Sequence, residues 1–280
     1  MPEIAYVNGE FLPLERATVH VEDRGYQFAD AVYEFVRTYG GRPFAVAEHL
    51  HRLFVSLDAI GLKHNFTLAG LEAIIQEAVR RAAFPESAIY LQVSRGQAKR
   101  HRGVPANYEP TLVLTVRQLV STANFCEIGV KLITVPDQRW ARCDIKAVGL
   151  LANVLAYQAA HQAGASDAIF CEADDTVNEA TAGNIFIVTT AGEFVTPLKS
   201  CRILAGVTRD KLLQAAVSAG IPTAERRISK TELLSAAEVI LSSSTAEVVP
   251  VVMVDGQPIG TGQPGPVARK VYAEFLRRLP

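Results

Sequence analysis

The sequence contains little of what builds disulfide frameworks, secretory leaders or membrane spans. Its four cysteines, at positions 126, 143, 171 and 201, are widely spaced and include no CxxC pair. We therefore expect free thiols in a reducing, cytoplasmic setting. The first residues, MPEIAYVNGEF, lack the basic and apolar regions of a secretory signal. No uninterrupted apolar run reaches the roughly 18 to 20 residues that would cross a bilayer, so we expect no membrane role.

An excess of charge of one sign is also absent. Lysine plus arginine number 28 and aspartate plus glutamate number 29, which gives a formal net charge of -1. Such a chain has no overall field to attract nucleic acid or an anionic membrane. Neither the G-x-G-x-x-G turn nor the phosphate loop of nucleotide-binding proteins occurs. His49 and His51 are two residues apart on an expected helix and do not face each other, so we expect no metal site.

The first part of the chain has the pattern of an α+β unit. Asn8-Gly9 lies between two β-rich runs and predicts a hairpin, because both positions tolerate positive φ. Gly40-Gly41 predicts a second hairpin in the same way, and Gly61 is placed to end a helix. Similar patterns predict the other elements of this part: strands over 32–39, 42–45, 88–94 and 111–116, and helices over 46–60 and 71–83.

The rest of the chain alternates strand and helix patterns. The expected strands cover 130–135, 168–171, 185–189, 239–242 and 248–254, and the expected helices cover 150–163, 207–219 and 267–279. A short polar stretch separates the two parts. We therefore predict two α+β domains: a small one over 1–117, a linker over 118–125, and a larger cofactor-binding one over 126–280.

Two residues have the chemistry of a site that uses an aldehyde cofactor. Lys146 lies beside apolar residues and near Arg139 and Arg142 in RWARCDIK, and both desolvation and like charge would lower its pKa toward a nucleophilic neutral amine. A solvated surface lysine is the alternative. Glu179, in TVNEATAGNIF, could keep a pyridinium nitrogen protonated, although alone it is an ordinary loop acid.

Three segments could bind a dianionic phosphate. LAGVTRD places Val207 and Thr208 at the start of a helix, where free amides favour an anion. LSSSTAE offers the hydroxyls of Ser244 and Thr245 at a strand end. Arg52 could supply a bidentate clamp. Each segment also has an ordinary explanation, as a helix cap, a polar turn or the solvated side of a helix.

Taken in order, these segments resemble the pyridoxal 5'-phosphate (PLP) enzymes of fold type IV, and among them most the D-amino acid aminotransferases. The motifs that carry this resemblance span nearly the whole chain: GYQFADAVYEFVRTYGG, EHLHRLFVSL, IYLQVSRG, RWARCDIKAVGLLANVLAYQAAHQAG, TVNEATAGNIF, ILAGVTRD and SSSTAEVVPVV. The resemblance implies a small N-terminal α/β sandwich and a larger C-terminal pseudo-barrel domain. It also implies a homodimer that acts on small amino acids and 2-oxo acids.

The resemblance further implies a role for each matching residue. Lys146 becomes the Schiff-base and proton-transfer lysine, and Glu179 the partner of the pyridine nitrogen. Leu204 packs against the cofactor ring. Tyr33 and Thr181 line the substrate pocket. The phosphate is bound by Arg52, Val207, Thr208, Ser244 and Thr245.

Two departures from the family pattern bear on the substrate. D-specific members bind the substrate carboxylate through R-x-H, whereas RGQAKRHRGVP keeps Arg100 and has Arg102 at the histidine position. Branched-chain enzymes usually follow the cofactor lysine with K-x-x-x-N-Y, but this chain reads KAVGLLANVL. We therefore predict transamination of D-amino acids such as D-alanine. The alternatives are a branched-chain L-amino acid or (R)-amine transaminase, or an aminodeoxychorismate lyase.

Overall fold

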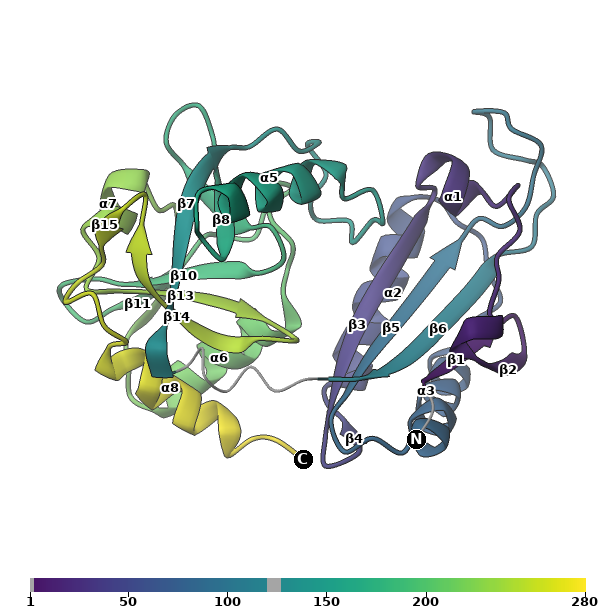
Figure 1. Ribbon diagram of the computed structural model, residues 1–280, viewed down its shortest axis with the longest axis horizontal. Helices are drawn as coiled ribbons and strands as arrows, with labels where there is room; N and C mark the ends of the chain where they lie inside the picture. Colours follow the sequence, from purple (N-terminus) through teal and green to yellow (C-terminus); the bar gives the residue numbers. More distant parts are fainter. Residues whose placement is uncertain (1–2, 120–126) are drawn as a thin grey trace. The chain divides into compact units, whose positions relative to one another are not determined.

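A computed structural model of the chain describes residues 3–119 and 127–280, and these form two compact units. The first unit contains the residues before the gap together with Ile145–Gly149. The second contains residues 127–144 and 150–279. Each unit has its own sheet (Figure 1). Each also has its own hydrophobic core.

The first unit is an antiparallel six-stranded sheet in the order β2-β1-β6-β5-β3-β4. Its strands are β1 (Ile4–Val7), β2 (Glu10–Pro13), β3 (Ala31–Tyr39), β4 (Arg42–Pro43), β5 (Ser87–Ser94) and β6 (Thr111–Gln118). Its helices are the short 3-10 helix η1 (Leu14–Arg16), α1 (Arg24–Phe28), α2 (Val46–Ala59) and α3 (Leu68–Ala82). The apolar stripes of α2 and α3 pack on the sheet, because Leu53 and Ile75 share one core with Val36 and Leu91.

Both predicted hairpins are confirmed, and the turn residues adopt the backbone that the sequence indicated. Asn8 and Gly9 have φ values of 44° and 107°, and Gly40 and Gly41 have φ values of 55° and 79°. Positive φ at both central positions matches the right-handed twist of the flanking strands.

The second unit is built on a nine-stranded sheet. Its strands are β7 (Val130–Pro136), β8 (Asp167–Cys171), β9 (Val177–Ala180), β10 (Asn184–Val188), β11 (Phe194–Thr196), β12 (Thr223–Glu225), β13 (Glu238–Ser243), β14 (Glu247–Val254) and β15 (Gln257–Pro258). Its helices are α5 (Leu151–Gln162), α6 (Val207–Ser218), α7 (Lys230–Leu234) and α8 (Pro266–Leu276).

Six of these strands close into a ring. Strand β9 pairs with β8 on one side and with β10 on the other, so that β10, β13, β14, β7, β8 and β9 follow one another around a barrel. Alternate residues of β10 and β13, such as Ile185 and Leu241, belong to the buried core of this barrel. Their neighbours Asn184 and Ser242 therefore point to the outer face. This closure confirms the expected pseudo-barrel.

The predicted strands and helices are confirmed to within a few residues, while several short elements were not predicted. The missed elements are η1, α1, α7, β9, β11, β12 and β15. Of the predicted linker, Gln118 ends strand β6, and residues 120–125 lie outside the described residues. The domain limits of 1–117 and 126–280 stay a prediction. Within the described residues, no helix combines the length and the apolar character needed to span a membrane.

Candidate active site

Lys146 lies in a short extended segment of the first unit that runs beside β3. Tyr33 donates its amide to the Lys146 carbonyl at 2.9 Å, and the Lys146 amide donates to Ser56 Oγ at 3.3 Å. The next residue, Ala147, forms an isolated bridge with Val32. These contacts hold the backbone of Lys146 and its neighbour, so the position of the Lys146 Cα is fixed. Its Nζ lies 4.3 Å from the centre of the Tyr33 ring, a cation–π contact.

Tyr33 in turn stacks on Tyr90, with ring centroids 5.3 Å apart. Burial, with a smaller effect of Tyr33, raises the pKa of Tyr90 to about 12, so this phenol stays protonated at neutral pH. Its hydroxyl donates to Gln92 Oε1 at 2.7 Å. The structure therefore brings together Lys146 and Tyr33, two of the site residues predicted from the sequence.

Arg52 lies on helix α2 and is held by a buried acid from β3. Its Nε and Nη2 donate to the two carboxylate oxygens of Glu34 at 2.7 and 2.8 Å. His49 Nδ1 lies 2.7 Å from Glu34 Oε2. Burial would raise the pKa of Glu34, but the charge and hydrogen bonds of Arg52, with smaller effects of His49, lower it to about 2. Burial lowers the pKa of His49 despite the opposing effect of Glu34.

The segment that carries Arg100 and Arg102 is anchored by a buried arginine. Arg24 is 4% exposed, and its Nη1 donates to the His101 carbonyl at 2.7 Å while its Nε donates to Asp30. Arg100 stacks on Phe28 at 4.6 Å and donates to the Gln27 carbonyl. Arg102 is exposed, and within the described residues its guanidinium has no hydrogen bond or ion pair.

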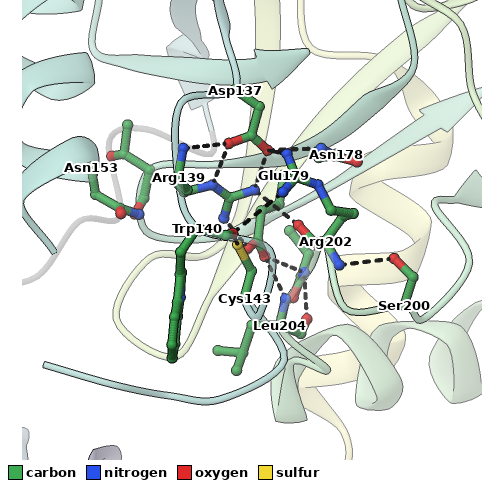
Figure 2. Close-up of polar contacts among 12 residues, drawn as sticks. Asp137, Arg139, Trp140, Cys143, Asn153, Asn178, Glu179, Ser200, Arg202 and Leu204 are labelled. Atoms are coloured by element: carbon green, nitrogen blue, oxygen red, sulfur yellow. Dashed lines mark hydrogen bonds and ion pairs between the residues drawn. The ribbon is translucent and has the colours of Figure 1, made fainter. Parts of the chain in front are cut away.

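Glu179 lies on β9 of the second unit at the centre of a buried polar network (Figure 2). Its Oε1 accepts from Arg139 Nη1 at 2.5 Å. Its Oε2 accepts from the Leu204 amide at 3.0 Å and from Asn184 Nδ2 at 3.2 Å. Hydrogen-bond donors therefore meet both oxygens of the Glu179 carboxylate and fix its position.

Arg139 is itself fixed from several directions. Asp137 accepts from its Nε and Nη2 at 3.0 and 2.8 Å, and the Arg202 carbonyl accepts from Nη2 at 2.9 Å. Its guanidinium also lies 4.3 Å from the centre of the Phe170 ring. Burial would lower the pKa of Arg139, but the hydrogen bond with Asp137 and the charges of Glu179 and Asp137 raise it.

These contacts bear on one expectation about Lys146. The sequence predicts that Lys146 feels the like charge of Arg139 or Arg142. Arg139 is paired with Asp137 and Glu179, and Arg142 donates to Asp144 at 3.0 and 2.9 Å. Each guanidinium therefore forms an ion pair with at least one carboxylate. Any effect of the two arginines on Lys146 stays a prediction.

The turn before α6 is tied to the same network through Asn184. Its Nδ2 donates to the Leu204 carbonyl at 2.9 Å as well as to Glu179. The Leu204 residue, expected to pack against a cofactor ring, is thus bonded at both its amide and its carbonyl. A Cβ on Gly206 would lie 2.0 Å from Asn184 Oδ1, so a larger residue at that position of the LAGVTRD turn would have to displace the Asn184 side chain.

Two of the expected phosphate segments are a helix start and a serine-rich turn. Gly206 is the N-cap residue of α6 and has no side chain to bond the first-turn amides, which include those of Val207 and Thr208. Ser243 Oγ accepts from the Ala246 amide at 3.0 Å and lies 3.1 Å from Thr245 Oγ1, which shapes the turn that carries Ser244 and Thr245.

Thr181 is engaged with a second buried acid. Its Oγ1 donates to Asp167 Oδ1 at 2.6 Å, and its carbonyl accepts from Asn153 Nδ2 at 2.7 Å. Burial raises the pKa of Asp167, while the hydrogen bond from Thr181 acts in the opposite direction. Thr181 is predicted to line the substrate pocket, and its hydroxyl already donates a hydrogen bond to Asp167.

Comparison with known proteins decides the family. The model of the amino-transferase class IV family matches residues 31–254. This chain belongs to the class IV aminotransferases. The D-alanine aminotransferase of Bacillus licheniformis is 39% identical over 264 residues, which cover 94% of this chain and 93% of that protein. The D-alanine aminotransferase of Listeria monocytogenes is 37% identical over 276 residues, covering 98% and 95%.

Solved structures show the same fold. The Escherichia coli branched-chain amino acid aminotransferase has a TM-score of 0.93 at 25% identity, covering 100% of this chain and 95% of that one. A branched-chain amino acid aminotransferase from T.th., complexed with N-(5'-phosphopyridoxyl)-L-glutamate, has a TM-score of 0.90 at 27% identity, covering 99% and 94%. The chain is therefore a two-domain fold type IV aminotransferase, and enzymes of this class depend on PLP.

The residues of this aminotransferase fit such a cofactor. In the second unit, a fixed acid, a helix start without a side-chain cap and a serine-rich turn have the chemistry of the acceptor and the anion donors that PLP requires. Sequence reasoning missed Asp137 and Asn184 and gave Arg139 another role. Asn184 follows Glu179 in the same quoted motif, which was the available signal. No such signal pointed to Asp137, because its role depends on the ion pair with Arg139, which forms only in the folded protein.

Proposed function

We propose that this aminotransferase uses PLP to transfer the amino group of D-amino acids, such as D-alanine, to 2-oxo acids. The observation that carries the proposal is the near full-length identity of 39% and 37% to two D-alanine aminotransferases. Branched-chain enzymes match at 25% and 27% identity. The polar network around Glu179 supports the use of PLP, because it holds the carboxylate that would accept a hydrogen bond from the ring nitrogen of the cofactor.

When bound, PLP supplies an aldehyde that takes the amino group and a ring that accepts electron density from the substrate Cα. Lys146 would hold the cofactor through Nζ. Once the amino group of the substrate has taken its place, the freed Lys146 amine would act as general base toward the α-proton and then as the general acid that delivers a proton to the cofactor. Hydrogen bonds of the Lys146 backbone with Tyr33 and Ser56 fix the position of the Lys146 Cα. Glu179 is the acceptor for the protonated ring nitrogen.

The remaining cofactor contacts are divided among backbone amides, hydroxyls and one guanidinium. Leu204 packs against the ring. The phosphate is bound by Arg52, the amides of Val207 and Thr208, and the hydroxyls of Ser244 and Thr245. Glu34 limits the role of Arg52, because it occupies Nε and Nη2 and leaves fewer donors for an anion.

Substrate recognition falls to Tyr33, Arg100, Arg102 and Thr181. We propose that the exposed guanidinium of Arg102 meets the substrate carboxylate where D-specific relatives have a histidine, since Arg binds carboxylates in a bidentate manner. Arg100 is bonded to helix α1 and supports that segment. We further propose that the enzyme works in the cytoplasm as a homodimer.

The test is incubation of the purified protein with PLP, D-alanine and 2-oxoglutarate. We expect pyruvate and glutamate to form, with D-glutamate shown by chiral chromatography. Lys146→Ala should remain folded and lose transamination, and borohydride reduction should fix the cofactor on Lys146 in the parent protein. Full activity of Lys146→Ala, or a preparation that takes up no PLP, would overturn the proposal.

A branched-chain L-amino acid aminotransferase is the second candidate, favoured by the TM-score of 0.93 to the E. coli enzyme. L-leucine with 2-oxoglutarate separates the two. Faster formation of L-glutamate from L-leucine than of D-glutamate from D-alanine would favour this candidate.

A further inference from the structure

We propose that the Ser242 hydroxyl is an additional ligand of the cofactor phosphate, beyond the segments assigned above. This inference rests on the proposed function, since it requires PLP at this site. Ser242 is the first serine of the LSSSTAE motif and lies in β13. It is 1% exposed, and within residues 3–119 and 127–280 its Oγ has no hydrogen-bond partner.

The strand register places Ser242 in the same row as the ring acid. Asn184 of β10 is opposite Glu179 of β9 on one side and opposite Ser242 of β13 on the other. Residues directly opposite on adjacent strands point their side chains to the same face. Glu179, Asn184 and Ser242 therefore form a line across three strands, on the outer face of the barrel.

That outer face is the one covered by the turn before α6 and by the start of α8. Asn184 bonds the Leu204 carbonyl and abuts Gly206, the N-cap residue of α6. At the far end of β13, the Glu238 carboxylate accepts from the Val267 and Ala268 amides of α8, both at 2.8 Å. Glu238 and Ser242 are four residues apart on one strand and share a face. The Ser242 side chain thus points to the side of the barrel on which α6 begins.

Its distance along the row assigns Ser242 to the phosphate end of the site. Two strand spacings, roughly 10 Å, separate the backbones of Glu179 and Ser242. Ser244, already assigned to the phosphate, is two residues farther along the chain. The ring nitrogen and the phosphate are at opposite ends of the cofactor, so a ligand far from Glu179 and close to Ser244 meets the phosphate.

The missing partner of Ser242 is the reason to expect a ligand. A buried hydroxyl left without a hydrogen bond is destabilising, and few native groups remain in that state. The adjacent Ser243 has its partners, since its Oγ accepts from the Ala246 amide and lies next to Thr245 Oγ1. A phosphate oxygen between the α6 amides and the serine turn would supply the acceptor that Ser242 lacks.

The experiment compares two ligands on apo-protein, PLP and pyridoxal, which has no phosphate. For Ser242→Ala we expect about a 10- to 100-fold weaker affinity for PLP, the usual effect of losing a hydrogen bond to a charged group. Affinity for pyridoxal should stay within about twofold. Equilibrium dialysis measures both, and the ³¹P resonance of bound PLP should shift in Ser242→Ala.

Two further variants keep the result interpretable. Ser242→Cys retains the shape of the side chain with a weaker donor, and we expect an intermediate loss of PLP affinity if the phosphate is the partner. Ser235→Ala removes a serine hydroxyl at the end of α7 that donates to the Thr231 and Glu232 carbonyls, and its ³¹P resonance should match that of the parent protein. Thermal unfolding of each apo-protein checks that the fold is kept.

The outcomes separate this inference from the proposed function. If the parent protein binds no PLP, the proposed function fails. If the parent binds PLP and Ser242→Ala binds it equally well, Ser242 contacts only an internal water and the inference is wrong. Equal losses for PLP and pyridoxal would also overturn it, because they would place the contact on the ring.

Discussion

Arg139 Nη1 donates to Glu179 Oε1 at 2.5 Å, while the same guanidinium is bonded along its other edge to Asp137. The side chains of Arg139, Asp137 and Glu179 are at most 8% exposed. Arg139→Met would remove the cation that bonds both buried carboxylates, and Asp137 would keep the more distant Arg202 Nη2, 3.5 Å from its Oδ2. We expect it to destabilise the apo-protein by about 3–5 kcal/mol, measured by urea unfolding.

A surface pair supplies the control for this prediction. Arg142 bonds Asp144, but its side chain is 49% exposed, so Arg142→Met should change stability by less than about 1 kcal/mol. Arg139→Lys should recover part of the loss because it restores the charge without the planar fork. Equal stability of Arg139→Met and the parent would show that the Arg139–Glu179 pair is unimportant for folding.

Gly206 and Asn184 should be coupled. A Cβ at position 206 would lie 2.0 Å from Asn184 Oδ1, so Gly206→Ala must displace the amide that bonds Glu179 and Leu204. We expect a destabilisation of roughly 1–3 kcal/mol. Asn184→Ala removes the obstacle, and in the double variant the Gly206→Ala substitution should be much less destabilising. Strictly additive unfolding free energies in this double-mutant cycle would contradict the predicted clash.

Acid should weaken the Glu34 site. The pKa of Glu34 falls from 4.5 to about 2 because the effects of Arg52 and His49 exceed that of burial. A carboxylate with a lowered folded-state pKa stabilises the fold fully above its unfolded value, and this stability is lost as the pH falls from about 4.5 toward 2. The difference corresponds to roughly 3 kcal/mol. Glu34→Gln should show a flatter dependence of the urea midpoint on pH in that range.

Glu77 provides the matched comparison. The hydrogen bonds from Arg80 and Arg81 also lower the pKa of Glu77 to about 2, but this helix-surface carboxylate is solvated. Solvent and salt screen such pairs. Glu77→Gln should therefore leave the acid dependence of stability nearly that of the parent. If Glu34→Gln and Glu77→Gln behave alike, burial is not what gives the Glu34 pair its strength.

Arg102 should affect substrate affinity more than stability. Its guanidinium is exposed and, in the described part of the chain, unpaired, so Arg102→Ala removes no internal contact. If it binds the substrate carboxylate, KM for D-alanine should rise about 10- to 100-fold. Lys99→Ala, which removes another exposed cation of the same loop, should leave KM nearly unchanged. Steady-state kinetics with D-alanine as the varied substrate measures KM for both variants.

By itself, the sequence determined the local backbone and the motif residues. Asn8-Gly9 and Gly40-Gly41 specify their hairpins because only certain residues adopt positive φ easily, and the apolar period of residues 46–60 specifies helix α2. Lys146 and Glu179 were selected by motifs that resemble a family. These patterns involve residues that are close together in the sequence, so they can be recognised without knowledge of the fold.

Only the tertiary structure decided which side chains meet. Arg139 and Glu179 are 40 positions apart, and nothing in RWARCDIK indicates that the arginine pairs with an acid on β9. The row of Glu179, Asn184 and Ser242 exists because β9 closes the barrel on β10. Long-range pairing of this kind depends on the register of whole strands and on burial, which no single segment encodes.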